Sequence, residues 1–153
     1  MNTIGWLHTV LAVSAMIAGA VMLLMQKGTR SHRRIGWFYV TTMVGLNVTA
    51  LAIYRLSGRF GPFHVAAVVS LGTVLAGYVV VLRRRRYSDW LRRHYLWMTY
   101  SYVGLLAAAA SEILTRMPAA PFWWAVALAS ALVFLVGAVM IRRHQEAILA
   151  RFA

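Results

Sequence analysis

The sequence predicts an all-α integral membrane protein, a bundle of five transmembrane helices in a single domain over residues 1–153. Hydrophobic residues make up 61% of the chain and charged residues only 12%, a composition that a water-soluble domain of this size could not keep off its surface. Apolar stretches of about 20 residues recur, each long enough to cross a ~30 Å hydrocarbon core as a helix. The predicted helices are residues 4–25, 35–54, 62–82, 94–114 and 119–141.

The apolar stretches are predicted to be helical because a peptide group in lipid has no water with which to form a hydrogen bond. In an α-helix each peptide group finds its partner within the same segment, so separate spans need no neighbour to satisfy their backbones. The connections between the spans are short, which makes sequence neighbours antiparallel. The expected architecture is a compact bundle in a lipid bilayer, with no separate water-soluble domain.

The basic residues flank alternate ends of the spans and predict the orientation. A net charge of +13 could indicate a nucleic-acid binder, but these residues border membrane spans and do not coat a soluble face, so no nucleic acid is expected. The positive-inside rule puts the N-terminus outside and the C-terminus in the cytoplasm of a bacterial inner membrane, with anionic headgroups beside the basic loops. The cytoplasmic set is Lys27, Arg30, Arg33, Arg34, Arg83, Arg84, Arg85, Arg86, Arg92, Arg93, Arg142, Arg143 and Arg151, against Arg55, Arg59 and Arg116 outside.

Four histidines are the main candidates for a buried site, because ionisable side chains are costly inside a bilayer. Alternating helix direction brings His8 and His64 to a similar depth near the outer surface, and His32 and His94 near the inner one. Paired imidazoles from facing helices are common axial ligands of low-spin haem, so each pair predicts a site for b-type haem in a membrane redox component. A quinone is the alternative ligand of the same histidines.

Helical phase predicts that His8 faces the interior of the bundle. At 100° per residue, His8 shares one face of the first predicted helix with Ala12, Ala15 and Gly19. Small residues let helix backbones approach closely where hydrophobic driving force between helices is absent. The histidine is therefore expected on the face that packs against another helix.

Glu112, near the outer end of the fourth predicted helix, suggests a different site. With His8 and His64 it would complete a set of two histidines and one carboxylate, which suits zinc and leaves a position open for water, as in metal-dependent hydrolases. The competing interpretation is an ion pair with Arg116, four residues later on the same helix. The sequence does not decide whether the protein is an enzyme.

Plainer structural roles compete with these interpretations. His32 lies among arginines and His94 follows two of them, so each would then simply extend a basic flank, while His64, at a helix start, would act as a cap or contact headgroups. Asn47 is expected to form a hydrogen bond between helices, and Ser101 lies on the helix face that joins His94 to Glu112. The protein would then be a non-catalytic accessory membrane subunit. Its fifth helix, without ionisable residues from Phe122 to Ile141, would contact a membrane partner or a second copy.

Three segments resemble a bacterial family of predicted membrane proteins catalogued as domain of unknown function 2306. They are Lys27–Gly36 (KGTRSHRRIG), Phe60–His64 (FGPFH), and Ser101–Ala107 (SYVGLLA) followed by Glu112. The resemblance extends from His8 to about Arg116 and implies a small polytopic inner-membrane protein, but no particular reaction. The residues that match the family pattern are His8, His32, Arg33, Gly36, His64, His94 and Glu112.

Overall fold

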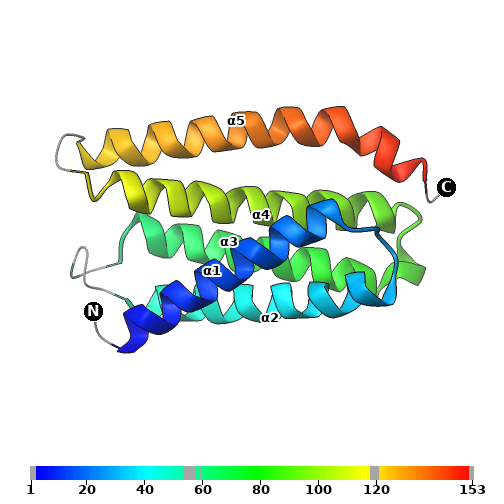
Figure 1. The fold of residues 1–153 in the computed structure, drawn as a ribbon, viewed down its shortest axis with the longest axis horizontal. Helices are drawn as coiled ribbons and strands as arrows, with labels where there is room; N and C mark the ends of the chain where they lie inside the picture. Colours follow the sequence, from blue (N-terminus) through cyan, green and yellow to red (C-terminus); the bar gives the residue numbers. More distant parts are fainter. Residues whose placement is uncertain (1–2, 54–57, 59, 118–120, 152–153) are drawn as a thin grey trace. The chain divides into compact units, whose positions relative to one another are not determined.

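A computed structural model describes residues 3–53, 58, 60–117 and 121–151, which form five α-helices and one short 3₁₀ turn, with no strand among them. This confirms the all-helical prediction. The elements are α1 (Thr3–Leu24), α2 (Arg30–Ala52), α3 (Pro62–Leu82), the 3₁₀ turn η1 (Arg84–Arg86), α4 (Trp90–Leu114) and α5 (Phe122–Leu149) (Figure 1).

Of the described helices, α1, α2, α3 and α5 are long and apolar enough to cross a membrane. Many large apolar side chains on them are exposed, among them Trp6, Ile17, Val69, Leu128 and Leu135. Such surfaces imply a lipid bilayer as the solvent. The crossing by α4, whose 25 residues include several hydroxyl side chains, and the orientation of the chain both stay predictions.

Several helix ends differ from the predicted ranges because hydropathy marks only the part of a helix that crosses lipid. α2 begins at Arg30, five residues early, where the Thr29 hydroxyl accepts a hydrogen bond of 3.1 Å from the backbone N–H of His32. α4 begins at Trp90, and α5 continues to Leu149. The predicted end at residue 54, the predicted start at residue 119, and Arg55 and Arg59 lie outside the described residues.

The chain divides into two compact units, Met1–Leu75 (unit 1) and Ala76–Ala153 (unit 2). The boundary falls within α3, so its first turns belong to unit 1 and its last turns to unit 2.

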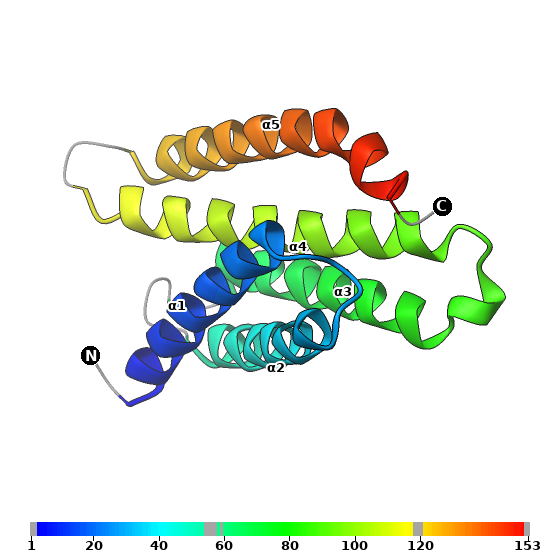
Figure 2. The ribbon, with the colours of Figure 1, turned by 45° about the vertical axis from the view of Figure 1, so that its right-hand side comes forward.

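In unit 1, α1 packs along α2, as Figure 2 shows. Ala15 is fully buried and Gly19 is buried too, which confirms the small-residue face predicted for this helix. On α2, Gly45 allows a close approach, because a Cβ atom there would lie 3.2 Å from Cδ1 of Leu11. The turn before α2 contains Gly28 at φ 79°, a backbone conformation that glycine adopts without strain.

In unit 2, α4 and α5 form an antiparallel helical hairpin. Val103 of α4 lies opposite Gly137 of α5, where a Cβ atom would meet the valine side chain at 2.6 Å. Ser111 lies opposite Ser130, with their hydroxyl oxygens 3.1 Å apart. These two contacts set the register of the pair, one by close backbone approach and one by a hydrogen bond.

At the start of α4, Asp89 forms an exposed ion pair of 2.7 Å with Arg93. This hydrogen bond from Arg93 lowers the pKa of Asp89 below its usual value of 3.8. Because the pKa is lower in the folded than in the unfolded protein, the pair stabilises the fold above the unfolded pKa, and that contribution is lost as pH falls through the folded pKa.

We therefore expect Asp89→Asn to lower the melting temperature slightly at about pH 6 and to have a smaller effect at about pH 2. Melting curves in detergent at both pH values check this. Glu146→Gln, which removes a carboxylate for which the described structure has no ion pair, is the control. An Asp89→Asn effect of undiminished size at the lower pH would contradict the assignment.

Candidate functional site

His8 lies on α1, half-buried, with its Nδ1 atom 3.0 Å from the hydroxyl oxygen of Thr49 on α2. The Thr49 hydroxyl also lies 3.0 Å from the carbonyl oxygen of Gly45, to which it donates. A hydroxyl has a single proton, so when Thr49 donates it to the Gly45 or Leu46 carbonyl, Thr49 accepts from His8 and the ring proton of His8 is on Nδ1. In the neutral ring, Nε2 then carries the lone pair that a metal or a hydrogen-bond donor requires.

His94, in the second turn of α4, carries its ring proton on Nδ1, because the group facing that atom can only accept a hydrogen bond. Its Nδ1 atom lies 3.0 Å from the carbonyl oxygen of Gly77 on α3. A carbonyl oxygen can only accept, so Nδ1 carries the proton and Nε2 the lone pair of the neutral ring. Both residues belong to unit 2.

The absence of a side chain at Gly77 allows the contact between His94 and the Gly77 carbonyl. A Cβ atom at Gly77 would lie 2.7 Å from Sδ of Met98 and 3.1 Å from Cβ of Trp97. The missing side chain lets α3 and α4 approach closely enough for the His94 ring to reach the Gly77 backbone. The ring is thereby fixed between two helices.

His64 has the opposite tautomer. It is only 4% exposed, and its Nδ1 atom accepts a hydrogen bond of 3.1 Å from the backbone N–H of Gly61 just before α3. This contact confirms the capping role considered for this residue, and Phe60 packs against the ring with centroids 5.0 Å apart. In the neutral ring the proton is on Nε2, so ligation of a metal through Nε2 would first require that proton to move.

The predicted pairings of the histidines stay predictions. His8 and His64, both in unit 1, bond to different groups, Thr49 and Gly61. His32 lies in the first turn of α2 and not before it, half-buried. The pairing of His32 with His94 joins the two units and stays a prediction.

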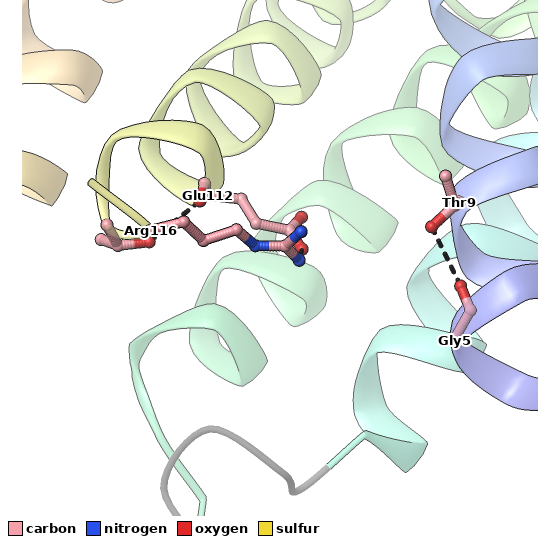
Figure 3. Close-up of polar contacts among 5 residues, drawn as sticks. Gly5, Thr9, Glu112 and Arg116 are labelled. Atoms are coloured by element: carbon pink, nitrogen blue, oxygen red, sulfur yellow. Dashed lines mark hydrogen bonds and ion pairs between the residues drawn. The ribbon is translucent and has the colours of Figure 1, made fainter. Parts of the chain in front are cut away.

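Glu112 forms an ion pair with Arg116, shown side by side in Figure 3, which confirms the i, i+4 pair predicted from the sequence. Within the described residues of either unit, no three histidine, aspartate or glutamate side chains gather as a metal site would require. The zinc set of His8, His64 and Glu112 draws on both units and stays a prediction.

The polar side chains within the helices mostly bond to their own helix. The Asn47 amide donates to the carbonyl of Met43 at 2.8 Å, where a bond between helices was expected. Ser101, which is 1% exposed, donates to the carbonyl of Met98 at 2.8 Å. Thr9 likewise donates to Gly5 at 3.0 Å (Figure 3). A backbone carbonyl three or four residues back is the nearest acceptor in lipid, which explains this preference.

Sequence reasoning missed the groups that orient the histidines. Thr49 contacts Nδ1 of His8, the Gly77 carbonyl sets the tautomer of His94, and the Ser111–Ser130 contact joins α4 to α5. The available signal was small or hydroxyl-bearing residues within otherwise large apolar runs. Nothing in the sequence says which of them meets which histidine.

A family model described as "Predicted membrane protein (DUF2306)" matches residues 5–145. No curated protein and no solved structure matches the chain. The matched range includes all the histidines and Glu112, and it covers most or all of each apolar helix described above. The chain therefore belongs to the DUF2306 family of predicted membrane proteins.

Proposed function

We propose that this protein is a membrane redox component that binds b-type haem, with Nε2 of His94 as an axial ligand. The observation that supports this is the hydrogen bond from His94 Nδ1 to the carbonyl oxygen of Gly77. Histidines that ligate metals commonly donate their other ring N–H to a backbone carbonyl. Such a bond fixes the tautomer and ring orientation and makes Nε2 a better ligand.

His8 is the proposed ligand of a second haem, since a Thr49 hydroxyl that donates to its own helix gives His8 the same tautomer. The sequence-based topology puts His8 near the outer surface and His94 near the inner surface. A haem at each of these depths would give an electron path across the bilayer. His64, whose Nδ1 accepts from Gly61, is the weaker of the two outer candidates, and His32 is the inner partner expected from the sequence.

A quinol is the second candidate ligand, and the same observation favours it. The Nε2 lone pair of His94 can accept a hydrogen bond from a hydroxyl of the quinol ring. A quinol with an apolar tail can reach such a site through the lipid. The zinc alternative has less support, because Glu112 would have to leave its ion pair with Arg116 to ligate the metal.

The test is an absorption spectrum of the protein purified in mild detergent and titrated with hemin, recorded before and after dithionite. We expect a Soret band that shifts on reduction, as histidine-ligated haem gives. A folded protein that binds no hemin contradicts the haem proposal. Extraction of the same sample into organic solvent then checks for a co-purified quinone.

A further inference from the structure

The turn between α3 and α4 carries four consecutive arginines, Arg83 to Arg86. Arg83 directly follows α3, with its N–H 2.9 Å from the carbonyl oxygen of Val79, and residues 84–86 form the 3₁₀ turn η1. The N–H of Arg86 donates to the Arg83 carbonyl at 2.8 Å. All four side chains are exposed, and all belong to unit 2.

No carboxylate of unit 2 neutralises these arginines in the described structure. The nearest in sequence, Asp89, is paired with Arg93, whose guanidinium also lies 5.1 Å from the ring centroid of Tyr87. Glu112 is paired with Arg116. Adjacent like charges repel, and the repulsion favours binding of an anion at the turn.

The geometry of the turn puts two of the arginines on one side. A 3₁₀ helix has three residues per turn, so side chains at i and i+3 eclipse each other. Arg83, which directly precedes η1, and Arg86, its last residue, have this spacing, and the backbone hydrogen bond of the turn joins them, so we infer that these two side chains lie on one side. Two neighbouring guanidinium forks match the oxygens of a phosphate group, each by two parallel N–H···O bonds.

The position of the turn identifies the source of that phosphate. It directly follows α3, which is long and apolar enough to cross a membrane. The turn therefore lies at the level of the lipid headgroups, whichever way the chain is oriented. We propose that Arg83 and Arg86 form a clamp, the Arg83–Arg86 clamp, for the phosphate of an anionic phospholipid. A zwitterionic headgroup fits less well, because its cationic group would lie beside the remaining arginines.

The test compares two variants of equal charge, Arg83→Gln/Arg86→Gln and Arg84→Gln/Arg85→Gln. Each is purified with an equal mixture of phosphatidylglycerol and phosphatidylcholine, and the retained lipids are identified by native mass spectrometry. We expect the wild type to retain phosphatidylglycerol in preference. In the 83/86 variant the ratio of retained phosphatidylglycerol to phosphatidylcholine should fall about tenfold, and in the 84/85 variant it should fall less than about twofold.

Equal losses in the two variants would show that only net charge matters and would overturn the clamp. A second experiment adds inorganic phosphate at the same concentration as the lipid phosphate. Displacement of the lipid by inorganic phosphate would show a site for the free ion and would overturn the lipid assignment. If the glutamine variant fails to fold, Arg83→Lys/Arg86→Lys keeps the charge but not the planar forks. This variant is expected to lose part of the preference, and full retention would contradict bidentate binding.

Discussion

Replacing His94 with alanine is expected to remove one haem, and with it about half of the Soret absorbance of a two-haem protein. The Nδ1 proton of the His94 ring is fixed by the carbonyl oxygen of Gly77 on another helix. Without the imidazole, no nitrogen remains at that position to ligate iron. Haem per protein, measured after hemin titration and removal of excess hemin, is the quantity to compare with the wild type.

His144→Ala is the matched control. The Nδ1 atom of His144 lies 2.8 Å from the carbonyl oxygen of Met140, so it has the same kind of hydrogen bond, but the acceptor is on its own helix and the side chain is exposed. We expect its haem content to equal that of the wild type. Equal haem loss in both variants, or none in His94→Ala, would contradict ligation by His94.

Gly137→Ala should cause the largest loss of stability among single-methyl additions in unit 2. The new Cβ atom would lie 2.6, 2.8 and 3.3 Å from three side-chain atoms of Val103 on α4. Valine is branched at Cβ and has few rotamers, so it cannot turn away. The helices must separate, at a cost of about 1–3 kcal/mol. Melting temperature or unfolding in denaturing detergent measures the effect.

Two further variants make this prediction specific. Gly104→Ala adds the same methyl group to α4 where no atom lies within 4 Å, and it should leave stability unchanged or slightly raised, because alanine favours helix over glycine. Val103→Ala combined with Gly137→Ala should recover most of the loss, since the clashing methyl groups are gone. If Gly137→Ala remains as destabilising without Val103, the clash is not its cause.

Much of the helical framework could be predicted from the sequence because the energetics of lipid are simple. Apolar runs must be helical there, and small residues at helical spacing indicate the packing face, as the buried Ala15 and Gly19 confirm. Hydropathy could not predict that α2 starts at Arg30, because Thr29 extends the helix into the basic segment by capping it.

The candidate site was only partly predictable. Depth and phase single out His8 and His94, but the position of the ring proton depends on which atom of another helix meets Nδ1. Those atoms, the Thr49 hydroxyl and the Gly77 carbonyl, are set by the register between helices. His64 illustrates this limit. Its predicted depth suits a ligand, yet its Nδ1 atom accepts a hydrogen bond from the Gly61 N–H and does not donate one.

The length of α5 offers a direct way to determine the topology. Its 28 residues rise about 42 Å, more than the ~30 Å thickness of the hydrocarbon core, so we expect the charged turns after Ile141 to extend into the aqueous phase. The sequence has no cysteine, so a cysteine at the exposed position Glu146 would be the only thiol available to a maleimide. Labelling of intact spheroplasts with a maleimide that cannot cross the bilayer would then show on which side of the membrane the last turns of α5 lie.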